Sequence, residues 1–287
     1  MLYRGDTVVP KLGIMLVLLS AITGLNPAYA NDREDTMCGW IKERLMFKIW
    51  SSAAPDPDES RIRGKQFIET VSFKTSDKRT LKGYRYLAHN PHAGPIEPKG
   101  YILMALGNAM IADQIIDDLM LFSQKGYDVY IYDYRGYGSS EGKRRIKAFI
   151  EDYKELVEHL NSQYQRHVLY GVSLGGAVFL NVIGSNVDFD RAVIDSSPSR
   201  LSTHGCPKEI DPAENVPDDA TNIMFITGGI DPVTGPEMTS ELIKLGKQRG
   251  ATVFEGPDYS HPFMDKEVHV HTERLERVLN FLHLPSE

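Results

Sequence analysis

Residues Gly171-Val172-Ser173-Leu174-Gly175 form a G-x-S-x-G sequence, the pattern of a serine nucleophile held on a tight turn between a strand and a helix. The flanking residues fit that setting, because a strand-like apolar run at 167–172 ends at the motif and a helical apolar run at 174–183 begins in it. The two glycines lack the side chains that so tight a turn excludes. Negative charge that develops near the N-terminus of a helix is favoured. The pattern therefore predicts nucleophilic attack by Ser173 on a carbonyl carbon.

A serine nucleophile needs a general base, and the base needs an acid that orients it. In this strand–turn–helix setting the chain order is serine, acid, histidine. Asp231 is the first carboxylate after a predicted strand at 222–227, and His261 lies in the loop after the last predicted strand. We expect Asp231 to be the acid, with Asp258 as runner-up, and His261 to be the base. The other histidines precede Ser173 or Asp231, or fall in the last helical segment: His89, His92, His159, His167, His204, His269, His271 and His283.

The oxyanion that forms during such an attack needs two backbone N–H donors. Leu174, which follows the nucleophile, is expected to supply one. The second is expected from the loop after a predicted strand at 101–106, where Asn108 is the first choice and Ala109 the second. This chemistry is acyl transfer through an acyl-enzyme, and it needs no metal and no organic cofactor. The rate should rise with pH through about 6.5, because His261 must be neutral to act.

The elements that must position these residues alternate between strands and helices. Two strand-like runs, 67–74 and 80–88, are joined by a turn at 76–79 and read as a β-hairpin. Further strands are predicted at 101–106, 128–132, 167–172, 191–195, 222–227 and 252–255, and helices at 111–125, 146–163, 174–183, 236–249 and 266–282. This order predicts an α/β fold with a mostly parallel eight-stranded sheet and helices on both faces. The crossover rule then brings the loops after the parallel strands to one edge.

The composition excludes several classes of protein. The chain has 287 residues, of which 41% are hydrophobic and 25% charged, and this excludes a disordered chain, a collagen, a coiled coil and a polytopic membrane protein. The net charge is −7 and no basic patch is evident, so nucleic acid is not an expected partner. Cys38 and Cys206 are too few for a cysteine-rich zinc module, and His269 and His271 lack a third ligand. The sequence leaves open whether the two cysteines form a disulfide.

Residues 1–30 have the pattern of a secretory signal peptide. Arg4 and Lys11 precede an apolar run at 12–22, which is shorter than the roughly 20 residues that a membrane span needs. The residues Ala28-Tyr29-Ala30 then supply an A-x-A cleavage signal. We expect export to the periplasm or the medium, with an uncleaved N-terminal anchor as the alternative. The oligomeric state stays open.

Residues 31–60 read as an amphipathic helix, at 37–50, and a polar connector. The apolar residues of this helix are Trp40, Ile41, Leu45, Ile49 and Trp50. We expect them to pack on the domain that follows, at 61–287. Peripheral membrane contact through the two tryptophans is the alternative.

From about residue 67 to residue 284 the chain resembles the α/β-hydrolase superfamily. Four motifs carry the resemblance in chain order: Leu106-Gly107-Asn108-Ala109, then Asp133-Tyr134-Arg135-Gly136-Tyr137-Gly138-Ser139-Ser140-Glu141-Gly142, then Gly171 to Gly175, then the loops of Asp231 and His261. The chain is similar to the small-lid serine hydrolases, which include esterases, protein depalmitoylases and serine aminopeptidase-like members. One departure is Leu106-Gly107, where the family usually has His-Gly and uses that histidine to brace the oxyanion loop.

The lid interval, residues 196–221, is polar and lacks the apolar periodicity of a helical cap. We therefore expect a short lid and an open site, with the acidic residues of the interval solvated: Glu209, Asp211, Glu214, Asp218 and Asp219. The sequence favours a serine hydrolase that cleaves carboxylic esters or thioesters of a small acyl substrate or an acylated molecule. A serine aminopeptidase-like peptidase and a catalytically silent binding module are the alternatives.

Overall fold

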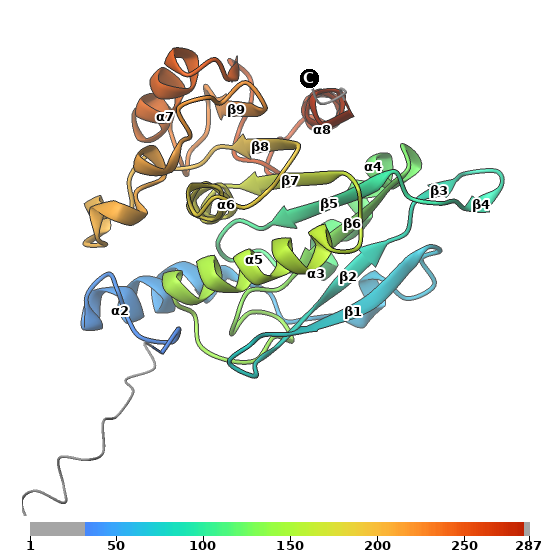
Figure 1. Ribbon diagram of the computed structural model, residues 1–287, viewed down its shortest axis with the longest axis horizontal. Helices are drawn as coiled ribbons and strands as arrows, with labels where there is room; N and C mark the ends of the chain where they lie inside the picture. Colours follow the sequence, from blue (N-terminus) through green and yellow to red (C-terminus); the bar gives the residue numbers. More distant parts are fainter. Residues whose placement is uncertain (1–31, 284–287) are drawn as a thin grey trace, which may run out of the picture. The chain divides into compact units, whose positions relative to one another are not determined.

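The computed structural model describes residues 32–283, so the expected signal peptide lies outside the described residues. The described residues contain an eight-stranded sheet with strand order β1-β2-β6-β5-β7-β8-β9-β10, whose arrangement can be followed in Figure 1. The strands are β1 Ile68–Lys74, β2 Thr80–Tyr86, β5 Gly100–Ala105, β6 Tyr127–Tyr132, β7 His167–Val172, β8 Arg191–Asp195, β9 Ile223–Gly228 and β10 Thr252–Gly256. The two strands β3, His89–Asn90, and β4, Gly94–Pro95, form a separate short ladder.

The sheet is antiparallel only at its N-terminal end. Strands β1 and β2 form the predicted hairpin, and β2 pairs antiparallel with β6. From β6 onward every neighbouring pair is parallel. Strands β5, β6, β8 and β9 are buried along their whole length, which explains why their sequences are nearly continuous apolar runs. The predicted mostly parallel sheet with an N-terminal hairpin is confirmed.

Helices cover both faces of this sheet. One layer contains α5, Ile146–Asn161, α6, Leu174–Gly184, and α7, Pro236–Gln248. On the other face α8, Val268–His283, packs against α4, Met120–Gln124 (Figure 1).

The helix predicted at 111–125 is not one regular helix. It is divided into α3 (Ala112–Ile115), a 3-10 segment η3 (Ile116–Leu119) and α4. The tightened turn falls on an Ile-Asp-Asp sequence, whose residues are weaker helix formers than alanine or leucine.

Helix α2, Trp40–Trp50, packs on the domain through different residues from those predicted. Glu43 and Phe47 are buried, whereas four residues expected to pack inward are exposed: Trp40, Ile41, Leu45 and Ile49. Glu43 is buried because backbone N–H groups surround its carboxylate, a long-range arrangement that a hydrophobic pattern cannot reveal. The described side chains do not include that of Trp50.

The lid interval contains three short 3-10 segments: η4 Ser202–His204, η5 Lys208–Ile210 and η6 Pro212–Asn215. Asp211, which we expected to be solvated, is fully buried. Its carboxylate accepts hydrogen bonds from the backbone N–H and the hydroxyl of Ser202, at 2.7 and 2.6 Å, and forms an ion pair with Arg200. Asp211 therefore stabilises the turn of the lid. A Cys38–Cys206 disulfide, with an S–S distance of 2.01 Å, joins this interval to the residues that precede α2.

Candidate active site

Ser173 occupies the turn between β7 and α6, with φ 53° and ψ −117°. This backbone conformation is uncommon for a residue with a side chain and is typical of a strained functional turn. A Cβ atom at Gly171 would lie 2.6 Å from the carbonyl oxygen of Gly175, and one at Gly175 would overlap the carbonyl oxygen of Ala105. The Ser173 N–H donates to the carbonyl oxygen of Asp195 at 2.8 Å. The turn is thus held tightly against the neighbouring strands β5 and β8.

Asp231 and His261 lie in contact at the same edge of the sheet. Asp231 follows β9, His261 follows β10, and the distance from His261 Nδ1 to Asp231 Oδ2 is 2.9 Å. The backbone N–H groups of Val233 and Thr234 donate to Asp231 Oδ1 at 2.8 and 2.9 Å. Burial by itself would raise the pKa of Asp231, but the His261 hydrogen bond and charge, with these two donors, hold it well below its usual range. Asp231 therefore stays ionised and can fix the orientation of the imidazole.

Thr234 connects this pair to the nucleophile turn. Its hydroxyl oxygen lies 3.0 Å from Asp231 Oδ2, 3.3 Å from His261 Nδ1 and 2.8 Å from the carbonyl oxygen of Ser196. Ser196 is the neighbour of Asp195, which accepts the Ser173 N–H. Sequence reasoning missed Thr234, although a threonine three residues after an aspartate on a turn is a recognisable local pattern.

The hydrogen bonds of the described site do not include one between the Ser173 hydroxyl and His261. In unliganded enzymes this bond is often long and tightens only when substrate is bound. Asp258, the runner-up for the acid, is not among the hydrogen-bond or ion-pair partners that the described structure gives His261. Within residues 32–283 no group of three or more His, Cys, Asp or Glu residues is arranged to hold a metal ion.

The expected oxyanion donors come from the start of α6 and from the loop after β5. Leu174 begins α6, and the first N–H groups of a helix have no partner within it. Asn108 and Ala109 lie in the loop that follows β5. Leu106, which stands where the family usually has histidine, is buried and carries no polar side chain.

Residues 133–142 supply hydrogen bonds to this oxyanion loop. The Tyr134 hydroxyl donates to the carbonyl oxygen of Leu106 at 3.0 Å, and the Tyr137 hydroxyl donates to Asn108 Oδ1 at 2.5 Å. The Asp133 carboxylate accepts the Ala112 N–H at 2.7 Å. The loop is therefore braced without the histidine, by a segment whose sequence was recognisable but whose role was not.

Burial raises the pKa values of two side chains that brace this loop, Asp133 and Tyr137. It raises the pKa of Asp133 to about 6, although the N–H groups of Ala112 and Ser139 oppose the rise. It raises the pKa of Tyr137 to about 12, with Arg144 and a backbone hydrogen bond from Ala109 opposing. The Tyr137 phenol thus remains protonated at neutral pH and can donate to Asn108.

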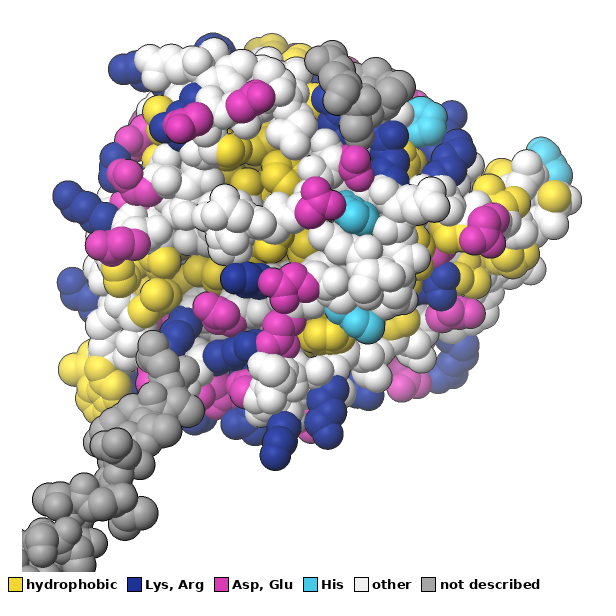
Figure 2. All heavy atoms as spheres, in the orientation of Figure 1, with side chains coloured by type: hydrophobic (Ala, Val, Ile, Leu, Met, Phe, Trp, Pro, Cys, Tyr) yellow, Lys and Arg dark blue, Asp and Glu magenta, His cyan; other side chains and the backbone are white. Residues whose placement is uncertain are grey.

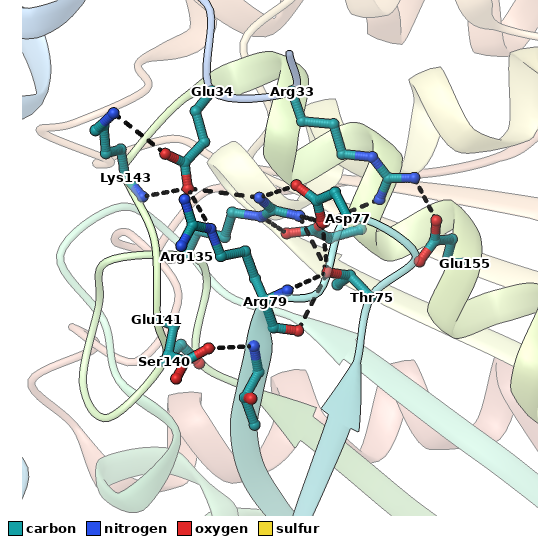
Figure 3. A network of polar contacts seen from close by, with 12 residues as sticks. Arg33, Glu34, Thr75, Asp77, Arg79, Arg135, Ser140, Glu141, Lys143 and Glu155 are labelled. Atoms are coloured by element: carbon teal, nitrogen blue, oxygen red, sulfur yellow. Dashed lines mark hydrogen bonds and ion pairs between the residues drawn. The ribbon is translucent and has the colours of Figure 1, made fainter. Parts of the chain in front are cut away.

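The bracing loop is itself anchored by a buried ion network (Figure 3). The Arg135 side chain is fully buried, and its guanidinium contacts Asp152 on α5 and Asp77 in the hairpin turn, each at 2.6 Å. Arg33 reaches the same Asp152 at 3.2 Å, and Glu34 lies 3.6 Å from Arg135. The guanidinium therefore links the loop to the β1–β2 turn and to α5.

A second buried cation, Arg274 on α8, joins the nucleophile side of the site to the His261 loop. Its Nε and Nη2 donate to the two carboxylate oxygens of Asp195 at 2.9 and 2.7 Å. Its Nη1 donates to the carbonyl oxygen of Ser260 at 2.9 Å and lies 3.2 Å from Asp265 Oδ2. Asp265 in turn accepts the Ser260 N–H at 2.8 Å. Arg274 thereby fixes the residue that precedes His261 relative to the end of β8, where the carbonyl oxygen of Asp195 accepts the Ser173 N–H.

One family model and several curated proteins match part of this chain. The model of the family described as serine aminopeptidase, S33, matches residues 96–208. An uncharacterized membrane protein of Saccharomyces cerevisiae is 30% identical over 167 residues, which are 53% of this chain and 53% of that protein. The chain thus spans about half the length of the curated relatives that it matches.

The solved structures that share the fold include an esterase and a peptidase. An esterase from Pyrococcus furiosus superposes with a TM-score of 0.58 and 17% identity, over 75% of this chain and 91% of that chain. A puromycin-hydrolyzing peptidase from Mycobacterium tuberculosis superposes with a TM-score of 0.60 and 18% identity, over 75% of this chain and 38% of that chain. At these identities the likeness establishes the architecture alone.

Proposed function

Since the chain belongs to the α/β-hydrolase superfamily, we propose that it is a serine hydrolase that cleaves carboxylic ester or thioester bonds through Ser173, His261 and Asp231. One observation carries the proposal: the 2.9 Å hydrogen bond between His261 Nδ1 and Asp231 Oδ2. It occurs in loops at the same sheet edge as the strained Ser173 turn. Nucleophile, base and acid are thus available in the order that the chemistry requires.

In the proposed reaction, Ser173 Oγ attacks the carbonyl carbon while His261 Nε2 takes the hydroxyl proton. Asp231 holds the Nδ1–H tautomer and stabilises the imidazolium. The N–H groups of Leu174 and Asn108 stabilise the oxyanion. When the tetrahedral intermediate collapses, the C–O or C–S bond breaks and the leaving alcohol or thiol takes the proton from His261. Water then attacks the acyl-enzyme with His261 as base and releases the carboxylic acid.

The surroundings of the pair favour an apolar acyl group. Three large apolar side chains beside Asp231 and His261 in the sequence are exposed, Ile230 by 63%, Val233 by 48% and Met264 by 53%. Exposed apolar side chains grouped near a reactive site are typical of a surface that binds an apolar ligand. The described part of the lid interval contains only three short 3-10 segments, which favours an open site, and such a site would offer few subsites for a peptide. A peptidase is the second candidate, because the family match describes serine aminopeptidases and one structural neighbour hydrolyses puromycin.

We also propose that the protein is exported. The A-x-A signal at Ala28-Tyr29-Ala30 supports export, and so does the disulfide between Cys38 and Cys206, since disulfides persist in oxidising compartments. N-terminal sequencing of the protein recovered from the periplasm or the medium tests this. A chain that starts at Asn31 is expected, and a chain recovered only in the cytoplasm would contradict export.

A fluorophosphonate probe tests the nucleophile, because it labels activated serines. We expect the wild-type chain to be labelled, Ser173→Ala to remain unlabelled, and Ser185→Ala, altered at the other end of α6, to be labelled like the wild type. p-Nitrophenyl esters of increasing acyl length, compared with aminoacyl p-nitroanilides, then separate the esterase from the peptidase. A folded wild-type chain that takes no label would overturn the proposal and favour a binding module.

A further inference from the structure

Helix α2 presents an apolar stripe on the outside of the domain. Ile41, Leu45 and Ile49 are exposed by 68, 51 and 59%, and their spacing of four residues places them on one face of the helix. Trp40, at the start of the helix, is 63% exposed. Figure 2 shows hydrophobic side chains gathered at the surface over α2. Single exposed apolar residues are ordinary, whereas a row of them on one helix is typical of a surface that binds a partner.

The opposite face of α2 is already packed on the domain. The Glu43 carboxylate accepts the N–H groups of Met37, Cys38 and Ile146 at 2.7, 2.9 and 3.1 Å. The Phe47 ring packs edge-to-face on Phe149 with the centroids 5.4 Å apart. If the helix rotated to bury its apolar stripe, both contacts would be lost. The stripe is therefore a fixed outer surface.

The charges on α2 are opposite in sign to those of the whole chain. Lys42, Arg44 and Lys48 are exposed, and the only acidic residue of the helix, Glu43, is buried. The chain as a whole carries a net charge of −7. Cations beside exposed apolar side chains match a surface of anionic headgroups over acyl chains, the usual partner of an interfacial amphipathic helix.

We propose that α2 is an interfacial helix that docks the protein on an anionic lipid bilayer, with Ile41, Leu45 and Ile49 inserted at the level of the headgroups. The apolar run at 12–22 ends less than two dozen residues before α2, so any stage at which that run engages a membrane also brings α2 to it. The Arg44 guanidinium lies over the Trp40 ring, 4.7 Å from its centroid, which suits a tryptophan at the boundary between headgroups and water.

Docking through α2 would also bring the sheet edge with Ser173 close to the bilayer. Cys38, two residues before the helix, is bonded to Cys206 in the interval that follows β8. Lys42 lies next to Gly205 in the same interval. This consequence for the substrate rests on the proposed function, whereas the docking itself does not.

The two tryptophans of the chain, Trp40 and Trp50, both belong to α2, so tryptophan fluorescence of the full chain reports the position of this helix. In a Trp50→Phe background we would add vesicles of phosphatidylcholine with phosphatidylglycerol and measure the emission of Trp40. We expect a blue shift, quenching by brominated lipid, and weaker binding to phosphatidylcholine alone or in high salt. The emission reports the surroundings of Trp40 itself, so binding through residues 1–31 alone would sediment the protein with the vesicles without shifting or quenching Trp40.

Substitutions test which side chains insert. Leu45→Asp combined with Ile49→Asp should weaken the Trp40 response about tenfold or more, since two apolar side chains are withdrawn from lipid and replaced by carboxylates. Ile96→Asp, at an exposed isoleucine outside α2, is the matched control and should change nothing. Arg44→Glu with Lys48→Glu alters charge alone and should weaken binding to the anionic vesicles in particular.

Three outcomes would overturn the proposal. One is Trp40 emission that is neither shifted nor quenched on vesicles that sediment with the protein. A second is a blue shift that depends on protein concentration without lipid, which would indicate a second copy on the stripe. A third is a shift without lipid that disappears when residues 12–22 are deleted, which would indicate that this run covers it. None of these readouts uses hydrolysis, so a failure here is distinguishable from a failure of Ser173 to be labelled.

Discussion

Replacing Arg274 with methionine should destabilise the fold and also slow the reaction of Ser173. The guanidinium is 1% exposed and contacts four partners: the Asp195 carboxylate, the Asp265 carboxylate, the carbonyl oxygen of Ser260 and the Ser196 hydroxyl. Methionine fills a similar volume but leaves both carboxylates without their cation. The Asp195 side chain is fully buried, so its charge cannot recover its hydration without movement of the backbone.

The size of the effect follows from this burial. Removing one partner of a buried ion pair costs about 3 to 5 kcal/mol, because the other charge stays buried and unpaired. The matched comparison is Lys247→Met, which breaks a pair with Glu255 whose side chains are both 56% exposed. An exposed pair contributes about 0 to 1 kcal/mol. Arg274→Lys keeps the charge but cannot bridge all of these partners, and we expect an intermediate loss.

Two measurements check this reasoning. Urea denaturation at neutral pH gives the free energy of unfolding. The rate of fluorophosphonate labelling, measured without urea where each variant is folded, reports the placement of His261 relative to Ser173. We expect Arg274→Met to slow labelling by about tenfold to a hundredfold, because a misplacement near 1 Å costs about that much. A stability loss no larger than that of Lys247→Met would refute the burial argument. Unchanged labelling in a destabilised Arg274→Met would refute its positioning role.

Three further predictions concern the brace and the disulfide. Tyr137→Phe removes the hydrogen bond to Asn108 and should slow labelling about tenfold, because that bond positions an expected oxyanion donor. Tyr101→Phe, which removes a hydrogen bond to Asn161, is the control and should leave the rate unchanged. Equal labelling rates in the two variants would contradict the bracing role of Tyr137. Asp133→Asn should reveal the raised pKa of Asp133, because the stability that the neutral carboxyl confers is fully present below about pH 4 and is lost as the pH rises through about 6. In urea denaturation at a series of pH values, the free energy of unfolding of the wild type relative to Asp133→Asn should therefore fall by about 3 kcal/mol over that range. A constant difference would show that the pKa is ordinary. The double variant Cys38→Ser, Cys206→Ser should have a free energy of unfolding lower by about 3 to 5 kcal/mol, because the disulfide closes a loop of 168 residues. Wild-type protein under reducing conditions should unfold at the same urea concentration as this variant.

The sequence predicts those parts of this protein that have a local pattern. The sheet could be read because buried parallel strands are continuous apolar runs, and the nucleophile turn because Gly171 and Gly175 are required within one short motif. The positions of Ser173, Asp231 and His261, each after a predicted strand, predicted that the three side chains lie close together at one edge of the sheet. The structure brings Asp231 and His261 into contact there, and their catalytic roles remain predictions.

What the sequence did not reveal depends on partners far apart in the chain. Arg274 and Asp195 are separated by 79 residues, and Arg135 and Asp77 by 58. A local sequence pattern, which covers only a few residues, therefore contains neither pair. The inward face of α2 was mispredicted for a related reason. A hydrophobic pattern assumes that apolar residues define the buried face, whereas here a buried carboxylate, Glu43, defines it and the apolar stripe remains outside.

Buried charges hold the loops of this site more strictly than apolar packing would. Apolar side chains tolerate sliding and repacking, whereas a buried ion that loses a partner leaves an uncompensated charge, so its partners must stay in register. Arg135 ties residues 133–142 to the hairpin turn, and Arg274 ties the His261 loop to the end of β8, beside the Ser173 turn. Glu43 in the same way ties α2 to the start of α5. Each of the segments that must hold its position, either for the proposed acyl transfer or for the proposed contact with a bilayer, is therefore fixed by an ion that cannot leave its partners without a cost of several kcal/mol.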